Sequence, residues 1–192
     1  GLNVTKIRTV LGDIRPDELG VTLPHEHLIT FPPMRTRTDP DYRLDSVEKA
    51  IKETEIYRTA GGGGIGEMTG RGYGRDIQSL RQISEKTGIH IISTTGFIMN
   101  SLFPAEVYDL SESELAKLMI SEVTDGVDGS GLRCGVIKCG TSKDFMTGAE
   151  KKVIRAAAKA HKETGAPIST HTTDGTMAFA QIELLQAEGV DL

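Results

Sequence analysis

Two histidines, His25 and His27, stand two residues apart in the stretch VTLPHEHLITF and are the first candidates for chemistry in this sequence. In a β-strand, residues i and i+2 point to the same face, so an extended chain here would turn both imidazoles the same way. Neutral imidazole is the commonest protein ligand for zinc-like ions, and two rings on one face can share a cation. The spacing also fits two histidines at a strand tip that hold no metal.

Lys138 is the next candidate, because it interrupts the apolar stretch GVIKCG. A buried ammonium is costly unless a carboxylate pairs with it, and such a pair is one interpretation of this residue. The other interpretation is chemical, since a lysine in a poorly solvated site has a lowered pKa and can react as a free base. With carbon dioxide it would form a carbamate, whose two oxygens can bridge two divalent metal ions.

Short β-rich runs alternate with helix-like segments, and these elements must position the candidate side chains. The expected strands span residues 21–29, 63–69, 89–96, 134–141 and 166–172, and the expected helices span residues 44–61, 76–88, 111–126, 147–165 and 175–189. Strict alternation predicts parallel βαβ units. Chemistry in such folds gathers at the carboxyl ends of the strands, where His25, His27, Lys138 and His171 all fall.

The other two histidines fall elsewhere. His90 starts the third expected strand, on the opposite rim, and His161 lies in the lysine-rich segment AAAKAHKETG, where we expect a solvated side chain. A doubly wound sheet would also fit the alternation, but no G-x-G-x-x-G follows the first strand and there is no P-loop. The glycine-rich AGGGGIGE leads into a strand, so we interpret it as a connection from helix to strand.

Composition excludes several classes of protein. The net charge of −5 argues against a nucleic-acid partner, and the longest charge-free stretch is too broken by polar residues and proline to span a membrane. The two cysteines, Cys134 and Cys139, indicate a reducing compartment without a disulfide framework. Because the N-terminal residues show no signal-peptide pattern, we expect a cytoplasmic protein.

Taken in order, these motifs resemble the phosphotriesterase family of the amidohydrolase superfamily, and especially its phosphotriesterase-homology branch. GVTLPHEHL resembles the first-strand H-x-H signature, GYGRDIQSL the opening of the second helix, and STTGF the end of the third strand. GVIKCGTS resembles the strand with the carboxylated lysine, and GAPISTHT resembles the strand with the next metal-binding histidine. The matches run in order from about residue 10 to the last residue.

The resemblance implies an α/β fold of the (β/α)8 TIM-barrel type with two divalent metal ions, usually zinc. It implies that His25 and His27 bind the more buried ion, that His171 binds the second, and that carboxylated Lys138 bridges both in the catalytic centre. The implied reaction is hydrolysis of ester-type bonds by metal-activated hydroxide. The substrate would be a small-molecule phosphotriester, lactone or carboxylic ester.

Two segments bear on the substrate. Lactonase-like members carry a tyrosine where this sequence has Ile98, which is our expected substrate-binding residue. Together with Phe97 and Met99 it would form an apolar wall suited to an uncharged ester, although ordinary core packing fits these side chains equally well. Arg71 and Arg75 in the stretch RGYGRD could meet an anionic group.

The family also places a metal-binding histidine at the end of strand six and an aspartate at the end of strand eight. Successive expected strands start about 36 residues apart, so eight units need about 290 residues. We therefore expect residues 1–192 to form the N-terminal portion of a single barrel, its first five βα units, truncated before strand six.

Such a portion would expose its outer strands until the rest of a longer chain, a homo-oligomer or a complementing chain closes the barrel. Alone it would bind metal weakly and turn over poorly. The alternative is a non-catalytic fragment or interaction module that retains the barrel scaffold.

Overall fold

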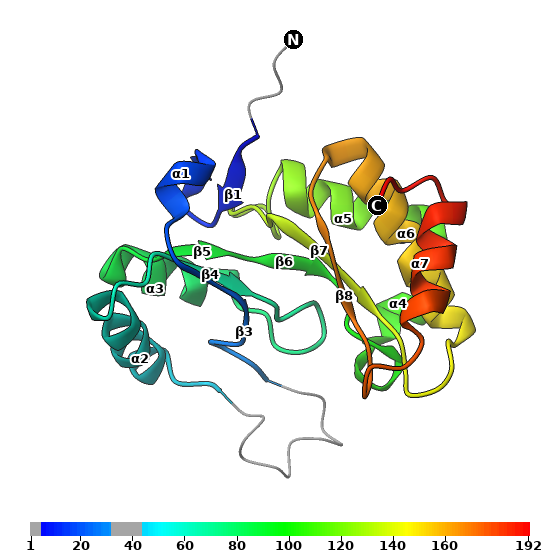
Figure 1. Cartoon of the computed structure of the whole chain (residues 1–192), viewed down its shortest axis with the longest axis horizontal. Coiled ribbons are helices and arrows are strands. Elements are labelled where there is room, and N and C mark those ends of the chain that lie inside the picture. The colour runs from blue at the N-terminus through cyan, green and yellow to red at the C-terminus, as the bar shows by residue number, and fades with distance from the viewer. Residues whose placement is uncertain (1–4, 32–43) are drawn as a thin grey trace.

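The fold is an array of parallel strands with helices packed along it, seen in a computed structural model that describes residues 5–31 and 44–192 (Figure 1). Each expected strand is present but shorter than predicted. The strands are β3 (Thr22–Glu26), β4 (Gly64–Glu67), β5 (His90–Ile92), β6 (Thr94–Gly96), β7 (Val136–Gly140) and β8 (Ile168–His171). Only Ser93 separates β5 from β6, so these two strands are halves of one extended run.

Strand order follows chain order. β3 pairs with β4 and β4 with β5, while β6 pairs with β7 and β7 with β8, and every one of these pairings is parallel. A doubly wound sheet reverses its order at a switch point, and the described strands contain no such reversal. The observed order is the one in which each βα unit lies beside the next.

The expected helices are also present, with ends close to those predicted. They are α2 (Val47–Thr59), α3 (Ile77–Thr87), α5 (Glu112–Thr124), α6 (Gly148–Thr164) and α7 (Ala178–Ala187). Ser46 caps the start of α2, and Ser111 caps the start of α5 by accepting from the Glu114 amide. Gly88 and Gly165, the last residues of two of the expected helices, follow α3 and α6 in the left-handed conformation.

Several short elements carried no recognised signal in the sequence. They are β1 (Ile7–Thr9) and β2 (Gly12–Ile14), which form an antiparallel hairpin, α1 (Pro16–Leu19), the 3-10 turn η3 (Asn100–Leu102) and α4 (Ala105–Asp109). The hairpin binds β5 through the Val10 amide, which donates to the Ile91 carbonyl at 2.9 Å. It therefore lies at the amino-terminal side of the sheet, away from the carboxyl ends of the strands.

The core lies between the strands and the helices that cover them. Ile77, Leu80 and Ile83 of α3 are buried at helical spacing, whereas Ile56 of α2 is 71% exposed. The side chains that α2 buries are those of Ala50 and Thr54. Every residue of β4 is buried, whereas β3 and β8, the outer strands of the described array, are partly open to solvent.

Figure 1 shows α2 and α3 beside the β3–β5 part of the array and α5, α6 and α7 beside β7 and β8. Within the described residues, we find no helix with the length and apolarity that crossing a bilayer requires. Cys134 and Cys139 are both buried free thiols.

Candidate active site

The four side chains singled out in the sequence line one cavity of about 460 Å³. His25 lies in β3 near its end and His27 directly follows that strand, while Lys138 lies within β7 and His171 is the last residue of β8. The structure thus brings together residues from three strands, as their positions in the sequence predicted.

The two histidines of the HEH stretch face each other. Their ring centroids are 5.4 Å apart and the rings meet edge to face. The pairing of β3 with β4 is irregular between Leu23 and Glu26, where three steps along β3 correspond to two along β4. Both rings nevertheless reach the same cavity, so the irregularity leaves the two imidazoles together.

Lys138 is a buried cation with no partner among the residues that the structure describes. The residue is only 1% exposed, and its Nζ atom makes no hydrogen bond within the described part of the chain. Burial lowers the pKa of Lys138 to about 8. The alternative of a carboxylate pair is therefore not realised among the described residues.

The backbone around Lys138 is tightly packed. Gly96 of β6 lies opposite Lys138 in the register of the two strands. A Cβ atom added at Gly96 would lie 2.1 Å from the Lys138 carbonyl oxygen, and Gly96 has a φ of +91°, which side-chain-bearing residues rarely adopt. Glycine at this position lets β6 run close against β7 and so fixes where Lys138 enters the cavity.

All three histidines of the cavity have lowered pKa values. Burial is the largest cause for each, and it lowers the pKa of His27 to about 4. The positive charge of Lys138 lowers the pKa of each ring further. The imidazoles are therefore neutral at pH 7, which is the state that binds metal ions.

Hydrogen bonds hold the ends of β7 and β8 in place. The buried Gln181 of α7 donates from Nε2 to Thr141 Oγ1 at 2.6 Å and to the His171 carbonyl at 2.8 Å. The buried carboxylate of Glu150 accepts from the Asn100 amide at 2.9 Å and from Ser142 Oγ at 2.8 Å. These contacts tie the segments that follow β6, β7 and β8 to one another around the cavity.

Two functional candidates, Glu67 at the end of β4 and Thr69 just after it, were missed in the sequence. Glu67 is fully buried, and it accepts hydrogen bonds from Thr69, whose hydroxyl lies 2.9 Å from His27 Nδ1. Burial raises the pKa of Glu67 to about 7. The available signal was the glutamate inside the apolar run GGIGEMT, which is the same kind of interruption that identified Lys138.

One wall of the cavity is apolar. Ile98, Met99 and Leu102 line it, which agrees with the wall expected from the stretch TGFIMN. Phe97 does not contribute, because it is fully buried and its ring packs edge to face on Phe103. Of the two roles expected for Phe97, the structure shows ordinary core packing, while Ile98 and Met99 line the cavity.

The arginines of RGYGRD do not line the cavity. Arg71 binds both oxygens of Glu106 and also Glu122, while Arg75 binds both oxygens of Glu122, all within 2.9 Å. Their proposed role toward an anionic substrate is therefore wrong. Both arginines form ion pairs with the buried carboxylate of Glu122, which lies in α5 more than 40 residues further along the chain.

A metal ion needs several donor side chains close together. Among residues 5–31 and 44–192, no three His, Cys, Asp or Glu side chains lie close enough together to hold one ion. The ligand scheme implied by the sequence asks for two histidines at one ion and one histidine at the other. Neutral imidazoles beside an unpartnered lysine amine fit that scheme.

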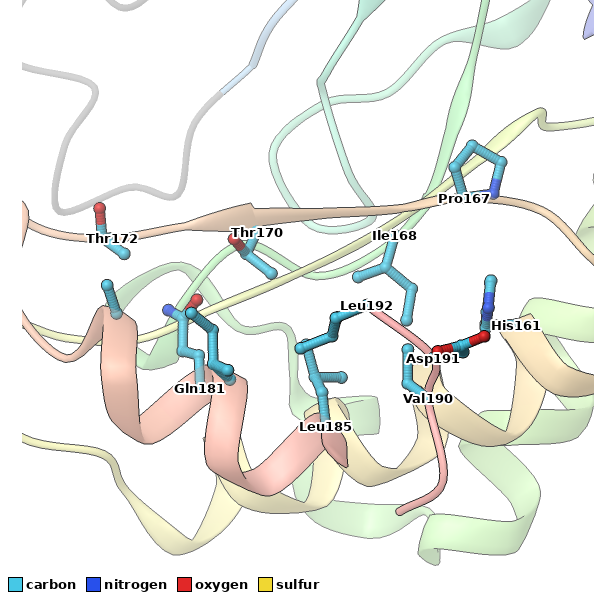
Figure 2. A pocket seen from close by; sticks show the side chains of 12 residues that line it. His161, Pro167, Ile168, Thr170, Thr172, Gln181, Leu185, Val190, Asp191 and Leu192 are labelled. Atoms are coloured by element: carbon cyan, nitrogen blue, oxygen red, sulfur yellow. The ribbon is translucent and has the colours of Figure 1, made fainter. Parts of the chain in front are cut away.

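A second cavity, of about 370 Å³, lies beside β8 and is bounded by α7 and the last residues of the chain (Figure 2). Its lining is mainly apolar, with Ile168 and Leu185 among the residues shown. His161 lines it as well, but the Nδ1 of His161 donates to the Ala166 carbonyl at 2.8 Å. The ring is thus half-buried and bonded, not solvated as expected.

The chain is similar to known proteins over most of its length. The phosphotriesterase homology protein of Escherichia coli is 41% identical over 177 residues, which are 92% of this chain and 60% of that protein. The human N-acetyltaurine hydrolase is 34% identical over 218 aligned positions, covering 97% of this chain and 62% of that protein. The chain thus spans about 60% of the length of the curated relatives it matches.

Solved structures give the same grouping. A lactonase from Listeria monocytogenes superposes with a TM-score of 0.91 at 36% identity, over 97% of this chain and 62% of that one. The E. coli homology protein, solved with phosphate in its active site, superposes with a TM-score of 0.86 over 92% of this chain and 61% of that one. Residues 5–192 match the Phosphotriesterase family, and the chain belongs to that family.

Proposed function

We propose that this chain carries part of the active site of a metal-dependent hydrolase that cleaves ester bonds. His25 and His27 would hold one divalent ion, His171 would hold a second, and carboxylated Lys138 would bridge them. The observation that carries the proposal is the unpartnered Nζ of Lys138, buried in a cavity that three neutral imidazoles line. A buried amine left without a partner costs stability, and a carbamate held by two cations would remove that cost.

Formation of the carbamate needs only this lysine and dissolved carbon dioxide. The free amine adds to the carbon atom of carbon dioxide through a new N–C bond, and the nitrogen releases one proton. The lowered pKa of Lys138 supplies more free amine near neutral pH than an exposed lysine would. The product carries two oxygen ligands that share one negative charge, and the proton lost from the nitrogen passes to solvent.

Zinc is the ion that matches these ligands, and bound there it would lower the pKa of a water molecule and polarise the bond under attack. The chain's own residues complete the environment. The apolar wall of Ile98, Met99 and Leu102 favours an uncharged part of the substrate. Among the described residues that line the cavity, Lys138 is the sole lysine or arginine, which also supports an uncharged substrate.

We propose that the described strands are the first five units of a (β/α)8 barrel. Strand order, parallel pairing and the likeness to lactonases over about 60% of their length support this. The remaining ligands would come from the rest of a longer chain or from a second chain. Residues 1–192 by themselves would then bind metal weakly and hydrolyse substrates slowly. A non-catalytic fragment or interaction module is the alternative.

The test measures metal content together with hydrolysis. The chain is loaded with zinc and bicarbonate, and bound zinc is measured for the wild type, for His25→Asn and for His161→Asn. His161 lies in the second cavity, so its variant is the matched control. We expect zinc uptake to fall in His25→Asn only, and a ¹³C-bicarbonate label to appear as a lysine carbamate in the wild type.

Hydrolysis is then assayed with a phosphotriester, a lactone and N-acetyltaurine. Faster hydrolysis of either ester would support the proposal, whereas preference for N-acetyltaurine would replace the ester substrate by an amide. Equal zinc uptake by both histidine variants would contradict the metal site. Two tightly bound zinc ions per isolated chain would contradict the proposed incompleteness.

A further inference from the structure

Glu67, Thr69 and His27 form a continuous hydrogen-bonded chain beneath the cavity. Glu67 Oε1 accepts from the Thr69 amide at 3.1 Å and from the Thr69 hydroxyl. The same hydroxyl oxygen lies 2.9 Å from His27 Nδ1. Glu67 and Thr69 are both fully buried, and neither lines the cavity, so neither of them is placed to contact a substrate.

The direction of each hydrogen bond follows from the donors available. With Glu67 as the carboxylate, Oε1 carries no hydrogen and accepts both bonds from Thr69. The single hydroxyl hydrogen of Thr69 is thereby committed to Glu67. The Thr69 oxygen then has only lone pairs to offer to His27, so His27 Nδ1 must carry the hydrogen and donate it.

A neutral imidazole that carries its hydrogen on Nδ1 has its lone pair on Nε2. Nε2 of His27 makes no hydrogen bond within the part of the chain that the structure describes, and the ring lines the cavity. A hydrogen bond to the non-ligating nitrogen is how proteins commonly select the tautomer of a metal-binding histidine. Here the acceptor is the Thr69 hydroxyl, and the buried carboxyl group of Glu67 fixes the orientation of that hydroxyl.

We infer that Thr69 is a positioning residue for His27, which it holds in the Nδ1–H tautomer with Nε2 free to bind a metal ion in the cavity. The tautomer follows from these contacts with Glu67 as the carboxylate, whereas its use in metal binding rests on the proposed function. Glu67 acts one step further away, by orienting the Thr69 hydroxyl. His25 has no comparable bond among the described residues, so this device belongs to one histidine of the pair.

The experiment reads the tautomer directly, in metal-free protein labelled with ¹⁵N-histidine. The chain has five histidines, and long-range ¹H–¹⁵N correlations distinguish the protonated nitrogen of each ring. His27→Gln assigns the His27 signals. His161, whose Nδ1 donates to the Ala166 carbonyl, serves as the internal reference for the Nδ1–H tautomer. Zinc affinity is measured on the same samples by competition with a chelator.

Two substitutions separate positioning from packing. Thr69→Val keeps the shape of the side chain but removes the hydroxyl, and Thr69→Ser keeps the hydroxyl. We expect His27 to show the Nδ1–H pattern in the wild type and in Thr69→Ser, and a mixture of tautomers in Thr69→Val. Zinc affinity should fall about 10–100-fold in Thr69→Val, the usual effect of losing such a hydrogen bond, and recover in Thr69→Ser. An unchanged His161 signal shows that the variant is folded.

The possible failures are distinct. An Nε2–H pattern for His27 in the wild type would overturn the inference whether or not zinc binds. A changed tautomer in Thr69→Val with unchanged zinc affinity would overturn the positioning role. A wild type that shows the expected tautomer but takes up no zinc would overturn the proposed metal site and leave the hydrogen-bond direction confirmed.

Discussion

Lys138 of β7 and Arg75, in the segment between β4 and α3, both have buried cationic side chains, and their surroundings are opposite. Arg75 lies in a network with Arg71, Glu106 and Glu122, in which two positive and two negative groups meet. Arg75 also donates to the Thr94 carbonyl at 3.1 Å. Lys138 makes no hydrogen bond among the described residues, and its neighbours in the cavity are neutral imidazoles.

The difference distinguishes charged groups that stabilise the fold from a charged group that is available for chemistry. The arginine network joins the segment after β4 to α4 and α5, and its ionic groups satisfy one another. The charged groups of this network are therefore bonded to one another, and they are not available to bind or react with a substrate. The lysine keeps its reactive nitrogen unbonded at a cost in stability, which is typical of residues retained for function.

The largest expected effect comes from breaking the structural network. Glu122→Gln keeps the size of the side chain but leaves Arg75 and Arg71 without their shared carboxylate. Removing one member of a buried ionic group lowers the free energy of unfolding by about 3–5 kcal/mol. Urea unfolding of the metal-free chain measures this. Glu106→Gln, whose side chain is 30% exposed, is the control and should cost about 1 kcal/mol or less. Equal losses of unfolding free energy in the two variants would show that the buried network is no more important for stability than the exposed ion pair.

A smaller effect, of opposite sign, is expected at Lys138. Lys138→Met replaces an unpaired buried amine by an apolar side chain, so the metal-free protein should gain about 1–3 kcal/mol in unfolding free energy. The same substitution should lower zinc uptake, because the bridging ligand is lost. Lys152, which donates to the Leu110 carbonyl at 2.7 Å, gives the matched control, since Lys152→Met removes a paired lysine and should gain no stability. A destabilised Lys138→Met with normal zinc uptake would indicate a structural lysine.

The smallest effect concerns the apolar wall and leaves both cations in place. Ile98→Tyr adds the hydroxyl that lactonase-like members carry at this position. We expect the ratio of kcat/KM for a lactone to that for a phosphotriester to rise about tenfold, the scale of one pocket contact. Leu102→Met in the same wall is the control and should leave the ratio unchanged. If both variants shift the ratio alike, Ile98 has no special role in substrate choice.

Much of the fold was readable from local sequence. The alternation of runs predicted the strands of the array and the helices between them, because each buried face repeats with the period of its own element. Gly88 and Gly165 marked the ends of α3 and α6, since glycine adopts the left-handed conformation easily. The hairpin at β1 and β2 was missed, because three-residue strands are too short to show a period.

The sequence alone determined which residues would lie at the carboxyl ends of the strands, because direction and spacing along a parallel βα array are local properties. That was enough to group His25, His27, Lys138 and His171. It could not decide which charges find partners, because partners come from distant parts of the chain. Glu122 reaches Arg71 from 51 residues away, and Thr69 reaches His27 from 42. Only the packing of the helices on the strands brought those atoms together, and so separated a paired arginine from a free lysine.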